Sequence, residues 1–519
     1  MSELFTQSKT SLMNVIIRAD AGPAVGTGHV MRMMALGEAC CKLGASVTML
    51  SGELPAGLVR RLLGCGIDVC QLEESNSDQS DAIETLEFAA RENADWIVLD
   101  GYGFDVPYQQ AMAGSSAEVM MMDDGNLADP NLVDAILNQN AYADNHDEDQ
   151  QILSGCQYTL LRSEFLSASA CEAKTIRQVA RRILVTLGGC DDANWTHQVL
   201  QALAEIGSQK LIVDVVVGAG YRHLDSLVEL KRSLPFSIRI HRNVDRMVDV
   251  MQRVDFAITA GGSTCYELAR CGVPALAIPV AENQEPIVKA LSEMETVAAF
   301  EPTGVAAQDI ATMSKMVRQL LRNPKARNRM SEAGRTLVDG QGAFRIARKM
   351  ANWGVTFRDA SLDDARQLLA WRNDPEVRSV SFDKEVVSLA TYQTWLERQL
   401  ESNNCRLLIA QTRKGQPIGQ VRLNYDNPQQ ARICLSLDHT RRAKGLGRAI
   451  IEKACQLGFE ENPIMDSIVA QIAPGNVASE RAFRSVGFVQ SQPTMINKKL
   501  AFQFVLWRDV DRRQRRSVA

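Results

Sequence analysis

"NVIIRADAGPAVGTGHVMRMMALGEA" (residues 14–39) begins with an apolar, largely β-branched run and ends with a longer segment that suits a helix. Between them lies a glycine-flanked turn, Gly26-Thr27-Gly28, followed at once by His29. A buried strand, a tight turn and a helix form the repeating unit of α/β proteins, and the amides at such a helix start favour anionic groups such as phosphate. A phosphate-binding turn does not need an imidazole, so His29 requires an explanation of its own.

Short apolar runs alternate with helix-like segments from residue 14 to about residue 285. Continuous apolar runs are typical of strands covered on both faces, as in parallel sheets, so the pattern predicts a doubly wound α/β architecture. A polar segment at 141–180 separates two sets of strands, which predicts two Rossmann-like domains, 1–170 and 171–350. Because α/β sheets bind ligands beyond the carboxyl ends of their strands, we expect a cleft where the two sets face each other.

The composition changes near Val355. A strand, a helix, and two strands around a Lys-Gly turn come first, and further strands and helices follow. This order predicts an α+β domain over residues 354–510. The basic tail, residues 511–519, is expected to be a solvated end.

Composition excludes several classes of protein. The net charge of −5 gives no electrostatic reason to expect nucleic acid as a partner. No apolar stretch approaches the length of a membrane span and the N-terminus has no secretory pattern, so we expect a cytoplasmic protein without membrane partners. None of the twelve cysteines falls in a CxxC pair, which favours reduced, buried thiols and no metal site.

A second informative stretch is "ITAGGSTCYELARCGVPALAIPVAENQ" (258–284). A strand ends in Gly261-Gly262, and Ser263 and Thr264 stand where a helix begins. Backbone amides there would suit a diphosphate, and Glu267, one turn into the helix, could accept both hydroxyls of a ribose. The spacing of Thr264 and Glu267 also fits a capping box, so a plain helix start is the alternative.

These residues carry a family resemblance. "GGSTCYEL…CGVPALAIPVAENQ" resembles the UDP-binding half of the two-domain glycosyltransferase B (GT-B) fold, in particular MurG-like enzymes. "RADAGPAVGTGHVMR" (18–32), "LDGYGFD" (99–105), "MMDDG" (121–125), "ILNQN" (136–140), "YTLLRSEF" (158–165) and "ILVTLGGCDDAN" (183–194) resemble a narrower group, the UDP-sugar hydrolases of the pseudaminic acid pathway. These enzymes remove UDP from UDP-2,4-diacetamido-2,4,6-trideoxy-β-L-altropyranose and leave the free sugar.

The resemblance implies a role for His29. A hydrolase must activate water, and an imidazole, which titrates near neutral pH, suits the general base beside the anomeric carbon. A helix-start histidine satisfied by carbonyl groups is the alternative. Asp20, Tyr102 and Asp123 stand at predicted strand ends, and a sugar contact or catalytic role for them is weighed evenly against loop capping.

By the same resemblance, the C–O bond breaks with inversion, and the 261–264 helix start stabilises the leaving diphosphate without an obligatory metal. The residues expected at the UDP-sugar are Gly28, Arg32, Gly188, Gly189, Gly261, Gly262, Ser263, Thr264, Glu267, Asn283 and Gln284.

The stretch "LSLDHTRRAKGLGRAIIEKACQLGF" (435–459) contains R-x-x-G-x-G between a strand and a helix. Glycines there allow successive amides to approach a pyrophosphate, although a plain glycine turn is the alternative. "NVASERAFRSVGF" (476–488) and "WRNDPEVR" (371–378) resemble GNAT acetyltransferases, which implies acetyl-CoA as the co-substrate and a splayed strand, "ICLSL" (433–437), that holds its pantetheine arm. The residues expected at acetyl-CoA are Leu437, Arg442, Lys444, Gly445, Leu446, Gly447, Arg448 and Asn476.

One position departs from the GNAT pattern. Many of these enzymes have a tyrosine seven residues after the asparagine, as general acid to the leaving thiolate. Phe483 stands there and cannot donate a proton, so another group or water must serve, or acetyl transfer is impaired.

The fold class expected is therefore α/β, with two Rossmann-like domains in a GT-B arrangement followed by an α+β GNAT domain. The family pair implies two consecutive steps on one chain: N-acetylation of UDP-4-amino-4,6-dideoxy-N-acetyl-β-L-altrosamine, then hydrolysis of the diacetamido product. The alternatives are a UDP-sugar glycosyltransferase with an attached acetyltransferase, a related nonulosonic acid pathway hydrolase, and a nucleotide-sugar sensor whose catalytic parts have decayed.

Overall fold

A computed structural model describes residues 13–22, 25–72, 79–143, 151–167, 174–218, 220–242, 244–353, 355–412, 415–442, 446–496 and 498–508. Backbone contacts divide the chain into two compact units, with the division between Arg348 and Lys349. The first unit contains two separate sheets and the second contains one. None of the helices in these described segments is long and apolar enough to cross a bilayer.

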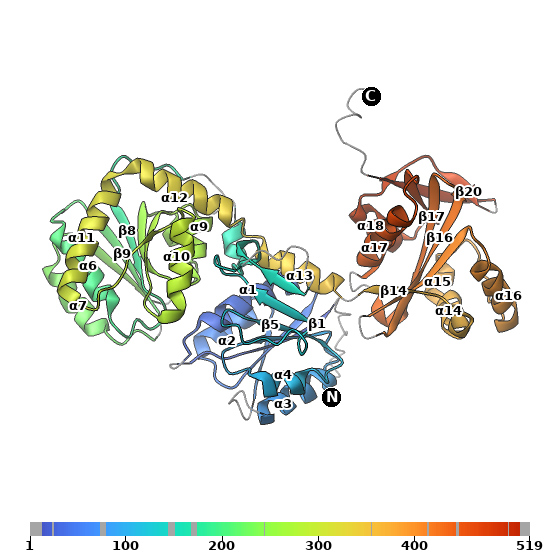
Figure 1. Cartoon of the computed structure of the whole chain (residues 1–519), viewed down its shortest axis with the longest axis horizontal. Coiled ribbons are helices and arrows are strands. Elements are labelled where there is room, and N and C mark those ends of the chain that lie inside the picture. Colours follow the sequence, from blue (N-terminus) through green and yellow to red (C-terminus); the bar gives the residue numbers. More distant parts are fainter. Residues whose placement is uncertain are drawn as a thin grey trace, which may run out of the picture. The chain divides into compact units, whose positions relative to one another are not determined.

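The first sheet is parallel throughout, with the strand order β3-β2-β1-β4-β5-β6-β7. Its strands are β1 (Asn14–Ala19), β2 (Ser46–Ser51), β3 (Asp68–Gln71), β4 (Trp96–Asp100), β5 (Glu118–Met122), β6 (Ala135–Asn138) and β7 (Ile152–Ser154). Its helices are α1 (Gly28–Lys42), α2 (Ala56–Gly64), α3 (Gln79–Arg91) and α4 (Val106–Met112). Figure 1 shows α3 and α4 on one face of this sheet and α1 on the other, so the central strands are covered on both faces, as predicted.

The second sheet is also parallel, with the order β10-β9-β8-β11-β12-β13. Its strands are β8 (Arg182–Thr186), β9 (Ile212–Val217), β10 (Ser237–Arg242), β11 (Phe256–Ala260), β12 (Ala275–Ile278) and β13 (Ala298–Ala299). The helices that accompany it are α6 (Trp195–Glu205), α7 (Leu224–Ser233), α8 (Met247–Met251), α9 (Thr264–Arg270), α10 (Glu285–Glu293), α11 (Ala306–Arg322) and α12 (Pro324–Leu337).

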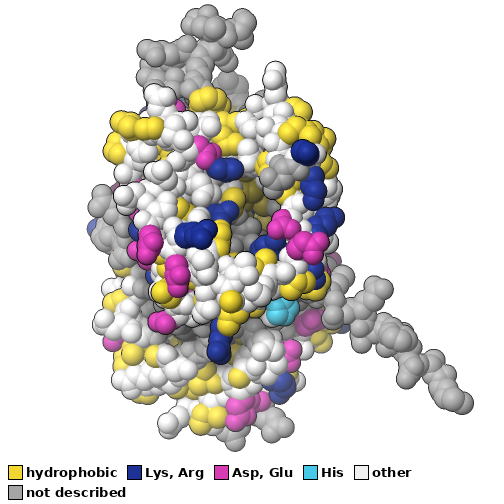
Figure 2. All heavy atoms as spheres, turned by 90° about the vertical axis from the view of Figure 1, so that its right-hand side faces the viewer, with side chains coloured by type: hydrophobic (Ala, Val, Ile, Leu, Met, Phe, Trp, Pro, Cys, Tyr) yellow, Lys and Arg dark blue, Asp and Glu magenta, His cyan; other side chains and the backbone are white. Residues whose placement is uncertain are grey.

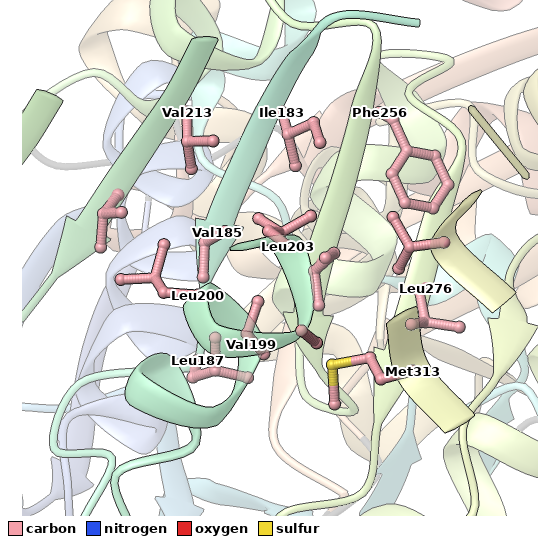
Figure 3. Packing of buried hydrophobic residues seen from close by; sticks show 14 of the residues in the cluster. Ile183, Val185, Leu187, Val199, Leu200, Leu203, Val213, Phe256, Leu276 and Met313 are labelled. Carbon is pink, nitrogen blue, oxygen red and sulfur yellow. The ribbon is translucent and has the colours of Figure 1, made fainter. Parts of the chain in front are cut away.

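The core of the second sheet explains why its strands read as uninterrupted apolar runs. Ile183 and Val185 of β8 and Phe256 of β11 point toward α6 and α11, and their side chains are fully buried (Figure 3). Burying each such side chain contributes about 1.5–3 kcal/mol, which no polar residue at these positions would match.

The helix α13 (Gly342–Asn352) returns from the second sheet to the first. Gly342 lies so close to the backbone of Thr159 that an added Cβ would stand 2.2 Å from its carbonyl oxygen. Arg345 donates to the carbonyl oxygen of Gln157 in the same segment. The last helix of the first unit therefore packs on residues that precede β8, and the two sheets belong to one unit.

The second unit is built on a mostly antiparallel sheet, β14-β15-β16-β17-β18-β21-β19, with β20 paired to β21. Its strands are β14 (Thr356–Asp359), β15 (Cys405–Gln411), β16 (Pro417–Asn427), β17 (Gln430–Leu437), β18 (Ser467–Ile472), β19 (Val489–Gln490), β20 (Thr494–Ile496) and β21 (Lys499–Trp507). Its helices are α14 (Ala365–Asn373), α15 (Pro375–Ser379), α16 (Leu389–Leu400), α17 (Leu446–Glu461) and α18 (Val477–Val486). Figure 1 shows α17 and α18 on one face of this sheet and α14 to α16 on the other.

The strands β17 and β18 are the parallel pair of this sheet, and they separate before they end. Their pairing runs from Gln430 opposite Ser467 to Ile433 opposite Ala470. Beyond Ile433, β17 continues to Leu437 while remaining paired with β16 on its other side. The predicted splay in "ICLSL" is therefore present after its first residue.

Short, partly exposed edge strands escaped sequence reasoning. The strands β3 and β7 were not predicted, because β3 has no fully buried residue and β7 is three residues long. Neither carries the continuous apolar run by which a covered parallel strand is recognised.

On the face drawn in Figure 2, basic and acidic side chains are interspersed and no continuous basic surface forms.

Candidate functional site

A closed turn delivers His29 to the first turn of a helix. Gly22 and Gly26 exchange two backbone hydrogen bonds, of 3.1 and 2.8 Å, across the loop that follows β1. Gly26 has a φ of 73°, which glycine adopts without strain, and α1 begins two residues later at Gly28. This closed turn determines where His29, the second residue of α1, leaves the backbone.

The imidazole of His29 is held by Asp100, the last residue of β4. Nδ1 of His29 lies 2.7 Å from Oδ1 of Asp100, whose side chain is fully buried. An ionised carboxylate only accepts hydrogen bonds, and this contact is shorter than the 3.2 Å between Nδ1 and Nη2 of Arg32. The geometry therefore favours the proton on Nδ1 and the lone pair on Nε2. The tautomer that a general base requires is therefore the one that Asp100 selects.

Arg32 keeps Asp100 ionised. It donates to both carboxylate oxygens, from Nε at 2.7 Å and from Nη2 at 2.5 Å, and its Nη1 donates to Asp124 at 2.8 Å. Burial alone would raise the pKa of Asp100, but the Arg32 guanidinium holds it below its usual value, and the two carboxylates raise the pKa of Arg32. Arg32, predicted at the UDP-sugar, therefore lies directly behind the imidazole.

Tyr102 contacts His29 and also reaches the second sheet domain. Its ring meets the imidazole edge to face, with the ring centroids 5.1 Å apart and the planes at 85°. Its hydroxyl oxygen accepts a hydrogen bond of 3.1 Å from Nδ2 of Asn283, which follows β12. The tyrosine ring remains half exposed at 51%, so solvent reaches this pair. Two residues predicted at the sugar from opposite halves of the unit are thus in contact.

The glycine pair after β8 faces the turn that carries His29. Gly188 has a φ of 95°, and a Cβ on Gly189 would stand 3.3 Å from Oγ1 of Thr27, the residue before α1. A Cβ on Gly218 would stand 2.4 Å from the carbonyl oxygen of Gly189, so β9 ends against the same loop. The predicted glycines therefore form a closely packed backbone beside the Thr27-Gly28-His29 segment.

The helix start after β11 does not form the capping box that was the alternative. Ser263 is the N-cap of α9, and neither a Ser263 cap bond nor a capping box is formed there. Gly262 has open space where a Cβ would stand, whereas a Cβ on Gly261 would lie 2.4 Å from Val288. Packing thus accounts for Gly261, and it does not account for Gly262.

Gln284 holds this loop together through its side-chain carbonyl oxygen. Its Oε1 accepts from the backbone amides of Gly261, at 3.0 Å, and Val280, at 3.1 Å. The side chain ties the end of β11 to the end of β12. Gln284, predicted to contact UDP, is therefore a residue that shapes the loop, and its neighbour Asn283 is the one that reaches Tyr102.

Glu267 is turned toward a cation from the other half of the unit. Its Oε1 lies 3.5 Å from Nη2 of Arg162, a long ion pair, while Arg162 is only 2.6 Å from Glu164. Burial raises the pKa of Glu267, Glu164 raises it further, and Arg162 opposes both. The carboxylate predicted to bind ribose is therefore held in place but incompletely neutralised.

Asp20 joins the ends of β1 and β2 and pairs with the buried Arg18, 2.7 Å away, whereas Asp123 is engaged by its own loop. Oδ1 of Asp20 accepts from Oγ of Ser51 and from the backbone amide of Gly52, both at 2.9 Å. Asp123 is 7% exposed and accepts from the backbone amides of Gly125, Leu127 and Ala128. Loop capping, the alternative weighed for both residues, accounts for the contacts of Asp123, whereas those of Asp20 link β1 to β2.

Two residues that sequence reasoning passed over complete the site. Asp100 ends the buried run "WIVLD", and Asp124 is the second aspartate of "MMDDG". Asp100 is the last residue of β4 and Asp124 follows β5 of the same parallel sheet, so their side chains meet at the same edge. The position of Asp100 at the end of an apolar run was a usable signal, whereas nothing in the sequence distinguishes Asp124 from Asp123.

In the second unit, Arg442 holds the end of the splayed strand. Its Nε and Nη2 donate to the carbonyl oxygen of Leu437, at 3.2 and 3.1 Å, and its Nη1 lies 3.0 Å from Asp374 and 2.8 Å from Glu376. These contacts occupy the guanidinium predicted to bind acetyl-CoA. Lys444 and Gly445, the next residues of the predicted loop, lie outside the described residues.

The helix α17 begins at Leu446 with an open first turn. Among the described residues, the atoms nearest to a Cβ on Gly447 would be those of Leu437 at 3.6 Å and Ala482 at 3.9 Å. Arg448 is half exposed and pairs loosely with Glu452, at 3.8 Å. Packing against the described residues therefore does not require a glycine at 447.

Asn476 and Phe483 both have structural partners. Oδ1 of Asn476 accepts from the backbone amide of Ser479 at 3.2 Å, so this side chain caps α18. Phe483 is 5% exposed and meets Phe488 edge to face, 5.0 Å between centroids. Its ring is part of the core, which was the alternative considered for it, and supplies no acid.

Among the described residues, no cluster of three or more His, Cys, Asp or Glu side chains is arranged to hold a metal ion.

Two known families match separate parts of the chain. Residues 182–340 match the glycosyltransferase family 28 C-terminal domain, and residues 355–489 match the acetyltransferase (GNAT) domain. The chain therefore joins a glycosyltransferase-like domain to a GNAT acetyltransferase domain.

Three curated relatives extend this picture. An uncharacterized protein of Methanocaldococcus jannaschii is 21% identical over 505 residues, which cover 92% of this chain and 97% of that protein. The spore coat polysaccharide biosynthesis protein SpsG of Bacillus subtilis is 26% identical over 64% of this chain and 96% of its own length. A UDP-2,4-diacetamido-2,4,6-trideoxy-beta-L-altropyranose hydrolase of Campylobacter jejuni is 23% identical over 53% of this chain and 94% of its own length.

Proposed function

We propose that the chain acts on one nucleotide sugar in two steps. The GNAT domain transfers an acetyl group from acetyl-CoA to the 4-amino group of UDP-4-amino-4,6-dideoxy-N-acetyl-β-L-altrosamine. The first unit then hydrolyses UDP-2,4-diacetamido-2,4,6-trideoxy-β-L-altropyranose to UDP and the free sugar. The observation that carries the hydrolytic step is His29, held by Asp100 and flanked by the Tyr102–Asn283 contact between the two sheet domains.

Hydrolysis requires a base for water, and His29 has the arrangement of one. Its Nδ1 is committed to Asp100, so Nε2 is the nitrogen that accepts the proton of the attacking water. Asp100 would then stabilise the imidazolium that forms, and Arg32 keeps Asp100 ionised in readiness. No acceptor hydroxyl is needed for this step, in contrast to glycosyl transfer.

The UDP portion is assigned to the loops of the second sheet domain. The diphosphate would receive hydrogen bonds from backbone amides beside Gly188 and Gly189 and around Gly262, Ser263 and Thr264. The open space at Gly262 supports a close approach of the ligand. Glu267 would bind the ribose hydroxyls. Its long ion pair with Arg162 supports this, because a weakly held carboxylate is readily shared with two hydroxyl donors.

Acetyl transfer is assigned to the separation between β17 and β18. The backbone of β17 from Cys434 to Leu437 lacks β18 as a partner, which leaves peptide groups for the pantetheine arm and the acetyl carbonyl. The first turn of α17, open at Gly447, would receive the pyrophosphate of acetyl-CoA. The sequence match to the GNAT domain supports the same ligand.

Glycosyl transfer is the rival function, and the match of residues 182–340 to a glycosyltransferase family favours it. Incubating the protein with the UDP-diacetamido sugar and no acceptor separates the two by mass spectrometry. Hydrolysis gives UDP and free sugar at equal rates. If the UDP-sugar persists until an acceptor alcohol is added, the first unit is a transferase.

A further inference from the structure

One face of the GNAT sheet changes from apolar to polar along its width. Leu407 and Ile409 of β15 pack under α14 and α16. Their cross-strand partners on β16 are Arg422 and Gln420, which therefore share that face. Opposite Arg422 on the next strand is Cys434, the first residue of β17 beyond its pairing with β18. A strip of half-buried polar side chains thus leads to the exposed Cys434, beside the point where the acetyl group is expected.

The polar atoms of this strip lack partners. Nε of Arg422, Oε1 of Gln420 and Nη1 of Arg372 on α14 are buried without a hydrogen bond in the described part of the chain. Buried donors and acceptors are nearly always satisfied, and each one left unsatisfied costs about 1–3 kcal/mol. Three such atoms from neighbouring elements indicate a polar group that the protein is built to receive.

The strip also carries surplus positive charge. Arg422 stacks over Trp395, 5.2 Å from the ring centroid, and its Nη2 is 3.8 Å from Sγ of Cys434. It makes no ion pair with a carboxylate of the described residues, and the pair of Arg372 with Asp383 is long, at 3.4 Å, and largely exposed. Burial raises the pKa of Tyr392, to about 12, against the opposing effect of both guanidiniums, so both charges lie near this side chain.

We propose that Arg422, assisted by Arg372, binds a phosphate of the acetyl acceptor, so that the GNAT domain selects a nucleotide-linked amine over a free one. The inference rests on the proposed function, because it names the acceptor of that reaction as an anion. A guanidinium presents a planar pair of N–H donors that fits phosphate oxygens, and the two arginine atoms without a partner are N–H donors that require an acceptor. Gln420 Oε1 would accept from a hydroxyl or amine of the same ligand.

The test compares two acceptors in the full-length protein by initial rates of CoA thiol release. One acceptor is the UDP-4-amino sugar, and the other is the same amino sugar without UDP. Arg422→Gln should raise the KM for the UDP-linked acceptor about tenfold or more. It should leave the KM for acetyl-CoA and the rate with the free amino sugar unchanged, and Arg422→Lys should fall between the two.

The matched control is Arg406→Gln. Arg406 also has a buried Nε without a partner, but Asp359, at 2.5 Å, and Glu461 neutralise its guanidinium. This variant should keep the wild-type KM for both acceptors. An equal rise in the KM for the UDP-linked acceptor in both variants, or a lower rate with the free amino sugar as well, would mean that Arg422 stabilises the sheet and does not bind phosphate.

Direct binding separates this inference from the proposed function. In calorimetric titrations with UDP, Arg422→Gln should lose one binding site, and the UDP site of the first unit should remain. If no acetyl transfer occurs but this site is lost, the phosphate site stands and the proposed reaction falls. If transfer proceeds with unchanged KM and unchanged UDP binding, the reaction stands and the phosphate site is overturned.

Discussion

Nδ1 of His29 lies 2.7 Å from Oδ1 of Asp100, and the two residues come from the start of α1 and the end of β4. The contact sets the tautomer of the imidazole, because a buried carboxylate held by Arg32 accepts the Nδ1 proton. It turns a histidine on a glycine-rich turn into a base with a defined reactive nitrogen. The proposed chemistry of the first unit depends on this one relationship.

Replacement of His29 by asparagine should abolish the release of UDP and leave acetyl transfer intact. Loss of a general base typically lowers a rate by on the order of 10²–10⁴-fold. UDP affinity, measured by titration of the same preparation, should not change. Hydrolysis near the wild-type rate would show that His29 is not the base.

Asp100→Asn should lower the hydrolysis rate through His29 without removing the imidazole. An amide can donate to Nδ1, which favours the wrong tautomer, and Arg32 loses one of its two carboxylates. Removal of one partner from such a buried pair destabilises a protein by about 3 kcal/mol. A pH profile of kcat that matches the wild type in shape would argue against a positioning role.

The stability of the same variant should depend on pH in a defined direction. Arg32 holds the pKa of Asp100 below its usual value despite burial, so the ionised form stabilises the folded state. That contribution is complete above the ordinary carboxyl pKa and is lost as the pH falls through the lower, folded value. The difference in unfolding free energy between wild type and Asp100→Asn should be full at about pH 7 and shrink below about pH 4.

Tyr102→Phe and Asn283→Ala should have effects that do not add. Each removes the 3.1 Å hydrogen bond between the two sheet domains, and the phenylalanine keeps the ring edge against His29. Each single change should reduce kcat/KM for hydrolysis roughly fivefold, which corresponds to a loss of about 1 kcal/mol of transition-state stabilisation. A double variant whose loss equals the sum of the two would mean that the contact does not couple them.

Glu267→Ala should weaken UDP binding more than tenfold, which corresponds to the loss of charge-assisted bonds to ribose. The stability of the free protein should not fall in parallel.

The pKa of Glu267 is raised by burial, so wild-type stability decreases as the pH rises through the folded value, and Glu267→Gln removes that decrease. The contribution of the protonated carboxyl is complete only below the ordinary carboxyl pKa, so thermal unfolding at about pH 4 and pH 8 should favour the glutamine variant at the higher pH. A variant with reduced stability and unchanged UDP affinity would leave Glu267 a purely structural role.

Gly447→Glu should abolish acetyl-CoA binding without unfolding the GNAT domain. Among the described residues, the nearest atom to an added Cβ is 3.6 Å away, so these residues leave room for the side chain, which would occupy the expected pyrophosphate position with a like charge. Hydrolysis of the diacetamido substrate should continue, and conversion of the 4-amino substrate should stop. If the variant still acetylates the 4-amino substrate, the loop is a structural turn.

Sequence alone determined the α/β character of the first unit and the GNAT character of the second. Buried parallel strands such as β4 and β8 contain continuous apolar runs, residues 96–99 and 183–185, and the β17–β18 splay was expected in the right strand. The candidate residues His29, Arg32 and Tyr102 were also found, because glycine turns and strand ends are local features that the sequence displays directly.

Tertiary structure decided which of these residues work together. Asp100 and Asp124 reach Arg32 across gaps of 68 and 92 residues, and Asn283 reaches Tyr102 across 181. Asp123 and Asp124 are chemically identical neighbours, and only the fold directs one to its own loop and the other to Arg32. Hydrogen bonds of this kind depend on where a side chain points at the edge of a sheet, and that direction is set by the packing of strands distant in sequence rather than by the identity of the residue.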